Sequence, residues 1–133
     1  MRYLLDTNIV SAMVRDPRGP ITEHIRTVGE KSVCTSVVVA AELRYGATKK
    51  GSARLLAQLE AVLTALEVLA LETPVDSVYG DVRTQLERAG HPIGGNDLLI
   101  AAHALSLEYT VVTDNEREFK RVEGLSVENW LRD

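Results

Sequence analysis

In Arg2-Tyr3-Leu4-Leu5-Asp6-Thr7-Asn8-Ile9-Val10, a charged residue interrupts an apolar run. The part before Asp6 is short, apolar and suited to a β-strand. The part after it suits a helix, with apolar residues at helical spacing: Ile9, Val10, Met13 and Val14. Asp6 is the only charge between Tyr3 and Val14. The stretch therefore predicts a strand that turns into a helix at Asp6, at the edge of an α/β sheet where ligand sites collect.

Short apolar segments alternate with helical patterns along the rest of the chain. Further strands are predicted over 32–36, 68–71, 109–113 and 125–127. Further helices are predicted over 21–28, 37–47, 52 to near 67, 74–90, 97–107 and a short segment through 119, with a break over 46–51. Asn96 is predicted to cap the helix that starts at Asp97. This alternation indicates an α/β layer fold with a mainly parallel sheet and right-handed crossovers.

The composition is that of an ordinary globular protein, and we expect residues 1–133 to form a single domain. No apolar run approaches the ~20 residues of a membrane span, and no signal peptide is recognisable, so we expect a cytoplasmic protein without a membrane segment. The net charge of −4 argues against a protein that coats nucleic acid non-specifically. The lone Cys34, in an apolar segment, is expected to be a small buried hydrophobe.

Isolated carboxylates are the informative feature of the sequence. Glu42 is the only charge between Ser32 and Leu43, and Asp97 is the only charge between Pro92 and Leu107. Like Asp6, these two acids lie in apolar surroundings, where a charge is costly unless it is paired or liganded. A fourth acid, Asp114, follows the apolar strand predicted over 109–113.

Each acid alone also has a structural explanation. Asp6 suits a helix cap, Asp97 suits the positive end of a helix dipole, and Asp114 suits a turn. Glu42 is harder to explain in this way, because a buried glutamate within a helix needs a partner. Acids that meet at one sheet edge repel one another unless a cation neutralises them, and oxygen ligands suit Mg²⁺ or Mn²⁺. The joint pattern favours metal-assisted phosphoryl chemistry.

Other catalytic groups compete poorly for this role. His24, His91 and His103 have positions typical of structural or surface residues. The sequence contains no Gly-x-Ser-x-Gly motif, no Cys/His signature and no P-loop.

Four segments of the chain carry a resemblance to a known family. They are Leu4 to Asn8, Val39 to Ala47, Gly90 to Ala104, and Val111 to Asn115 with Arg117-Glu118-Phe119. In this order and spacing, they resemble the PIN-domain ribonucleases of the VapC toxin family, and the likeness covers nearly the whole chain. Position by position, the family's metal-binding acids fall on Asp6, Glu42 and Asp97.

The fourth acidic position of the family is less well matched. Many PIN domains carry this acid two residues after the threonine, where this chain has Asn115. Asp114 lies one residue earlier. Either Asp114 reaches the site from a different angle, or Asn115 contributes through water and three acids suffice.

The resemblance implies a three-layer α/β/α fold, a homodimer, and a VapB-type antitoxin bound across the active-site groove. It also implies an Mg²⁺-dependent endoribonuclease, with Mn²⁺ as a substitute. The Pro-Ile-Gly loop and the Val-Glu-Asn-Trp ending look similar to the enterobacterial group that cuts initiator tRNA in its anticodon loop. Asp6 and Asp97 would be the primary ligands, assisted by Glu42 and Asp114. Hydrogen bonds around them would come from Thr7, Asn8 and Thr113.

Two other classes of function compete with this hypothesis. The shifted fourth acid and the negative net charge also suit a non-catalytic PIN fold that holds RNA or a partner protein. A phosphoacceptor domain of receiver type also gathers acids at a sheet edge, but it needs paired acids after the first strand and a lysine after a later one. Here a single acid, Asp6, follows the first strand, and no lysine follows Val112 until Lys120.

Overall fold

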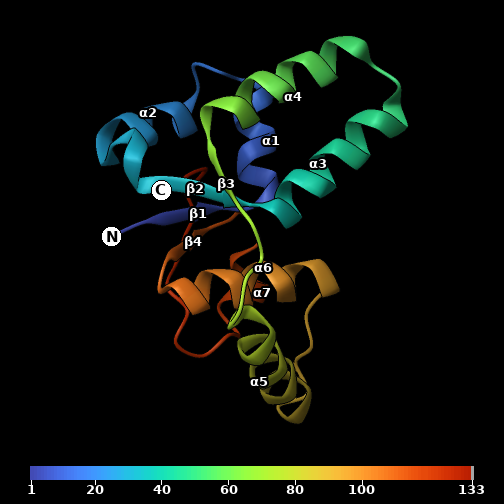
Figure 1. Ribbon diagram of the computed structural model, residues 1–133. Helices are drawn as coiled ribbons and strands as arrows, with labels where there is room; N and C mark the ends of the chain where they lie inside the picture. The colour runs from blue at the N-terminus through green and yellow to red at the C-terminus, as the bar shows by residue number, and fades with distance from the viewer. Residues whose placement is uncertain (133) are drawn as a thin grey trace.

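Five parallel strands form the centre of the protein in a computed structural model that describes residues 1–132 (Figure 1). The strands lie in the order β3-β2-β1-β4-β5. Their bounds are β1 Tyr3–Leu5, β2 Val33–Ser36, β3 Glu67–Leu69, β4 Thr110–Val112 and β5 Val127–Glu128. The prediction of a mainly parallel sheet is confirmed.

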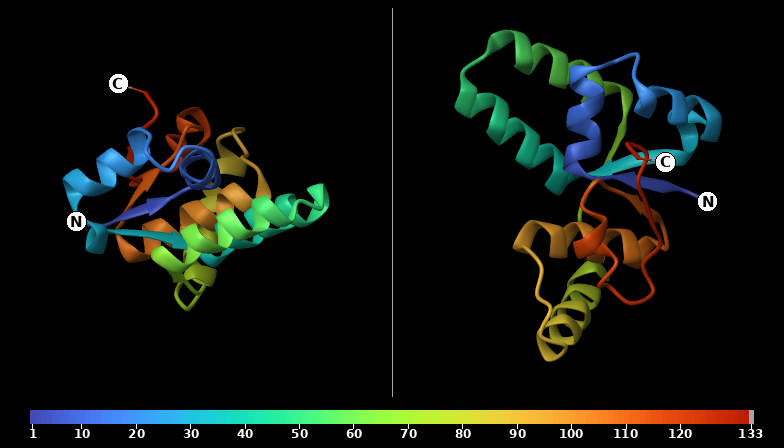
Figure 2. Two further views of the ribbon diagram at one scale, coloured as in Figure 1. Left: turned by 90° about the horizontal axis from the view of Figure 1, so that it is seen from above. Right: turned by 180° about the vertical axis from the view of Figure 1, so that it is seen from behind.

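Helices cover both faces of this sheet, which gives the three layers implied by the resemblance (Figures 1 and 2). The layer drawn above the sheet in Figure 1 contains α1 (Thr7–Arg15), α2 (Pro20–Val28) and α4 (Ala53–Ala65). The layer below it contains α5 (Val75–Arg88), α6 (Gly95–Leu107) and the short α7 (Glu116–Phe119). None of the helices in residues 1–132 combines the length and the apolar character that crossing a membrane requires.

The core consists of the strands and the helix faces turned toward them. The central strands are buried on both sides, which explains why their sequences are continuously apolar rather than alternating. Leu4, Leu5, Cys34, Val111 and Val112 are all 0% exposed. Cys34 is a buried hydrophobe, as predicted.

The helix α3 (Val37–Lys50) is longer than the sequence suggested. The predicted break over 46–51 was wrong except at its last residue, because the helix continues through Lys50 and is capped by Gly51, which has a φ of 65°. Ala47, which is 3% exposed, keeps this last part of the helix packed. That packing outweighs the cost of about 1 kcal/mol for a glycine inside a helix. Together, α3 and α4 form a hairpin that extends beyond the sheet (Figures 1 and 2).

Two further boundaries differ from the prediction. The helix α6 starts at Gly95 with Gly94 at the cap position, so Asn96 lies in the first turn and is not the cap. Its amide is used in a different way, since it donates a hydrogen bond to Glu42 at 3.1 Å. The last strand lies at Val127–Glu128 rather than over 125–127.

Candidate active site

The candidate site lies where the strand order of the sheet reverses. The central strand β1 pairs with β2 on one side and with β4 on the other, and the carboxyl ends of such strands are the usual place for a ligand. Leu5 pairs with Val112, which places Asp6 and Thr113 side by side just beyond the two strands. The N–H of Asp6 donates to the carbonyl of Val112 at 2.9 Å.

Asp6 is a buried carboxylate, only 3% exposed. Its Oδ2 accepts a hydrogen bond from the hydroxyl of Thr113 at 2.7 Å, as the sequence predicted for this threonine. Its Oδ1 is also buried, and within the described residues it has no hydrogen-bond partner. Burial raises the pKa of Asp6, while the hydrogen bond from Thr113 and the nearby backbone N–H of Thr7 lower it in part. A buried oxygen without a partner is costly, so this atom is suited to a ligand.

Glu42 faces the same region from α3 and is held by two other helices. Thr7, at the start of α1, donates its hydroxyl to Oε1 at 2.6 Å, as predicted. Asn96, in the first turn of α6, donates its amide to Oε2 at 3.1 Å. The carboxylate is therefore fixed at the junction of α1, α3 and α6.

Asp97 stands in the first turn of α6 and is partly buried. Its Oδ2 accepts a hydrogen bond from the amide of Asn115 at 3.1 Å. The pKa of Asp97 is raised to about 7. The largest cause is burial, followed by the contact with Glu118 and the charges of Asp6 and Glu42. These causes place the four carboxylates in one electrostatic cluster.

Glu118 is the member of this cluster that the sequence reasoning missed. It lies on α7, and the same Asn115 amide donates to its Oε2. Its hydrogen bond with Asp97 lowers the pKa of Glu118. The spacing could have identified it. Glu118 lies three residues after Asn115, and at the start of a helix residues three apart are neighbours on one face.

Asp114 is not brought together with the other acids. Its Oδ1 accepts hydrogen bonds from Arg132 at 2.9 Å and from Asn129 at 3.0 Å. These contacts lower the pKa of Asp114, whose side chain is 33% exposed. The predicted polar contact of Asn8 is made here, since its side-chain oxygen accepts the backbone N–H of Asp114 at 3.0 Å. The role of Asp114 in the site stays a prediction, and the contacts favour Asn115 and Glu118.

The donor atoms of the cluster fit a divalent cation. Within residues 1–132, no three His, Cys, Asp or Glu side chains already converge as a complete ligand set. Hydroxyls and amides instead occupy part of the carboxylate oxygens, while Oδ1 of Asp6 is left without a partner. Oxygen atoms and excess negative charge are what hard divalent cations require.

Comparison with known proteins identifies relatives along the whole chain. The model of the PIN domain family matches residues 3–125. Ribonuclease VapC2 of Rickettsia felis is 39% identical over 132 residues, with 98% of each chain covered. The tRNA(fMet)-specific endonuclease VapC of Salmonella typhimurium is 37% identical over 134 residues, with the same coverage. The crystal structure of VapBC2 from Rickettsia felis bound to a promoter DNA fragment gives a TM-score of 0.89 at 36% identity, covering 98% of this chain and 99% of that one.

The fold and the site define an α/β/α domain with a carboxylate cluster at the edge of a parallel sheet. The chain belongs to the PIN domain family, and its relatives within that family are VapC ribonucleases. The resemblance found in the sequence is confirmed.

We expect Asp97→Asn to stabilise the metal-free protein at neutral pH. The pKa of this carboxyl rises from an ordinary 3.8 to about 7 on folding, so the folded state loses stability as the pH rises through that window. The variant avoids this loss. In thermal unfolding with a chelator, its midpoint should exceed that of the wild type by roughly 2–6 °C above about pH 7 and should match it near pH 4.

Asp114→Asn is the control for this measurement. Arg132 lowers the pKa of Asp114, so its ionised form favours folding and the variant should show no stabilisation at neutral pH. Equal midpoints for wild type and Asp97→Asn at every pH would contradict the expectation.

A second pair of variants decides the fourth position of the site. Glu118→Gln should raise the Mg²⁺ concentration needed for half-maximal thermal stabilisation by about tenfold, whereas Asp114→Asn should change it by less than about twofold. If Asp114→Asn raised this Mg²⁺ concentration more than Glu118→Gln, then Asp114 and not Glu118 would be the fourth acid of the site.

Proposed function

We propose that this chain, as one PIN domain over residues 1–133, is an Mg²⁺-dependent endoribonuclease and the toxin of a VapBC-type pair. The observation that supports this most strongly is the buried Oδ1 of Asp6, near Glu42, Asp97 and Glu118, for which residues 1–132 supply no hydrogen-bond partner. PIN-domain nucleases generally depend on divalent metal, and the named relatives are ribonucleases.

The acids of the cluster would hold the cation, with Asp6 and Asp97 as the main ligands. Glu42 would complete the set, together with Glu118 or Asp114. A bound divalent ion lowers the pKa of water and neutralises charge on a phosphate. PIN relatives use such chemistry on RNA, and Mn²⁺ would serve as a substitute.

The neighbouring polar groups prepare this arrangement. Thr113 orients Asp6, and Thr7 with Asn96 orients Glu42. The Asn115 amide bridges Asp97 and Glu118, and the pKa of Asp97 is raised first by burial and then by its contact with Glu118.

The proposed substrate is initiator tRNA, cut in its anticodon loop. The Salmonella typhimurium relative is a tRNA(fMet)-specific endonuclease, which supports initiator tRNA as the substrate. An unpaired loop is the form of RNA in which the backbone and bases are most accessible to a protein site. A homodimer acting in the cytoplasm, where tRNA is found, completes the proposal.

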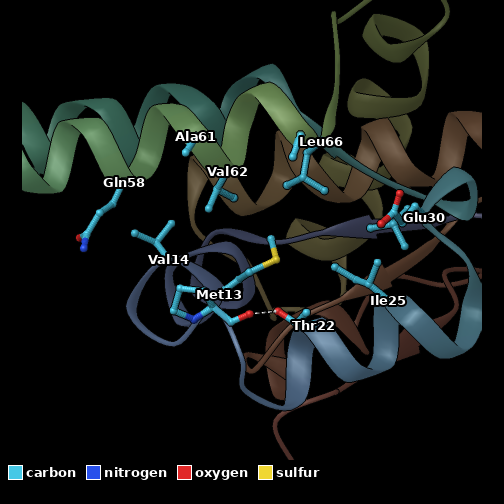
Figure 3. Close-up of a pocket in the computed structure, with 12 residues that line it drawn as sticks. Met13, Val14, Thr22, Ile25, Glu30, Gln58, Ala61, Val62 and Leu66 are labelled. Carbon is cyan, nitrogen blue, oxygen red and sulfur yellow. Dashed lines mark hydrogen bonds between the residues drawn. The ribbon is translucent and has the colours of Figure 1, made fainter.

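An apolar groove between α1, α2 and α4 is the proposed docking place of the antitoxin (Figure 3). Its volume is about 430 Å³. The side chains that line it are mostly apolar, and those labelled in Figure 3 include Met13, Val14, Ile25, Ala61, Val62 and Leu66. A lining of this kind suits an apolar segment of a partner protein.

A second hollow lies next to the groove. It shares Val14 with the groove and is also lined by Arg15, Glu42 and Lys50. A partner seated in the apolar groove can therefore extend to the active site. The solved relatives include VapBC complexes, which supports a VapB-type protein as the occupant.

The first test is cleavage of a purified tRNA pool. Wild-type protein with Mg²⁺ should cut initiator tRNA, and a chelator should stop the reaction. Asp97→Asn should lower the rate by at least about 10³-fold, because it removes a charged ligand of the proposed site. Metal-independent binding of RNA without cleavage would instead favour the non-catalytic PIN fold.

The second test concerns the antitoxin groove. Ala61→Lys places a charge in the apolar lining and should weaken binding of a purified VapB-type antitoxin by at least about tenfold. Thr64→Lys adds the same charge at an exposed position of α4 outside the groove, and it should leave the affinity unchanged. Both variants should cleave RNA like the wild type. If the two variants bound the antitoxin with equal affinity, the groove would not be part of the antitoxin interface.

A further inference from the structure

His103 is a buried histidine outside the proposed chemistry. It lies on α6, six residues after Asp97, and is 2% exposed. Its Nδ1 lies 2.9 Å from the hydroxyl oxygen of Ser36, which is 0% exposed. The structural role expected for this histidine from the sequence is consistent with its burial, but its partners connect it to the active site.

The hydrogen-bond roles in this group follow from its donors and acceptors. Burial lowers the pKa of His103, so the ring is neutral at pH 7 and carries one N–H. The backbone of Ala70 raises this pKa in part, as a carbonyl that accepts the ring N–H does. Nδ1 then accepts the hydroxyl proton of Ser36, whose oxygen in turn accepts the N–H of Val38 at 3.1 Å.

This network joins the two helices that carry proposed ligands. Ser36 caps α3, which carries Glu42, while His103 belongs to α6, which carries Asp97. Ala70 adds the segment that follows β3. One imidazole therefore fixes α6 against the start of α3 and against the sheet.

The hydrogen bonds of His103 add a directional link to the packing of α6. Next to His103, the buried Ala101, Ala102 and Ala104 are small and each 0% exposed, whereas Leu98 and Ile100 are the larger buried side chains of this helix. Apolar contacts are not directional, whereas a buried hydrogen bond is lost when the helix moves.

We propose that His103, acting through Ser36, is a positioning residue that sets Asp97 relative to Glu42. If α6 slid along its axis by the rise of one residue, Asp97 would move by about 1.5 Å. Misplacement on the order of 1 Å can lower a catalytic rate by about 10²-fold. This inference rests on the metal site and the nuclease activity proposed above.

The test measures metal binding separately from activity. His103→Leu and Ser36→Ala should each weaken the affinity for Mn²⁺, followed by electron paramagnetic resonance, by about tenfold. Each should also lower the cleavage rate at saturating Mg²⁺ and RNA by about 10- to 100-fold. The double variant should be little worse than either single variant, because both remove the same bond.

Two matched variants separate positioning from general destabilisation. His103→Gln keeps an acceptor for Ser36 and a donor for Ala70, so it should restore Mn²⁺ affinity to within about threefold of the wild type. Ser52 caps α4 as Ser36 caps α3, with its side chain accepting from the N–H of Leu55 at 3.1 Å. Ser52→Ala should lower thermal stability like Ser36→Ala but leave Mn²⁺ affinity unchanged.

The outcomes are distinct. Unchanged Mn²⁺ affinity in His103→Leu and Ser36→Ala, despite lower stability, would make His103 an ordinary core residue. If His103→Leu does not fold, the comparison of Ser36→Ala with Ser52→Ala decides in the same way. Mn²⁺ binding without cleavage by the wild type would overturn only the proposed function, whereas a wild type that binds no Mn²⁺ would overturn both.

Discussion

The structure of the site depends on one constraint, the burial of the Asp6 charge at the end of the central strand. Thr113 satisfies one carboxylate oxygen, and no group in the described chain satisfies the other. Leaving such an atom without a partner costs about 1–3 kcal/mol or more in an isolated domain. The buried core around Asp6 offsets this cost, and in the proposed metal site the same atom would bind the cation. At Asp6, the feature that lowers the stability of the metal-free protein would therefore favour the binding of a cation.

The other acids of the cluster also lower the stability of the metal-free protein, because neutral polar groups hold their like charges close together. Thr7, Asn96 and Asn115 each donate to a carboxylate from a different element, so the acids remain near one another without a counter-charge. Amides and hydroxyls are suited to holding the acids in place, because they orient a carboxylate oxygen without neutralising the negative charge. A lysine or arginine in their place would satisfy the acids and lower their affinity for a metal. Burial, and after it the contact with Glu118 and the neighbouring charges, raise the pKa of Asp97.

The acids that are isolated charges in apolar segments stood out in the sequence, whereas Glu118, which joins them only through tertiary contacts, did not. Asp6, Glu42 and Asp97 were recognisable because each is an isolated charge in an apolar segment, and this local signal survives folding. Glu118 gave no such signal, since it lies among other charged residues and becomes part of the cluster only through Asn115. The continuation of α3 through Gly46 was missed for a similar reason, because its packing on α4 outweighs the local preference of glycine. Asn96 was given a cap role by sequence convention, whereas its amide is used across the fold.

The helix α1 contributes residues both to the proposed active site and to the proposed antitoxin groove. Its first residue, Thr7, orients Glu42, and near its other end Met13 and Val14 line the apolar groove. Nine helical residues span about 13 Å, a distance that about four residues of extended chain can cover. A partner anchored in the groove therefore needs only a short extension to reach the acids. An inhibitor built in this way would take its affinity from apolar contacts and its effect from a few polar residues, so the toxin can keep a polar active site while binding its antitoxin tightly.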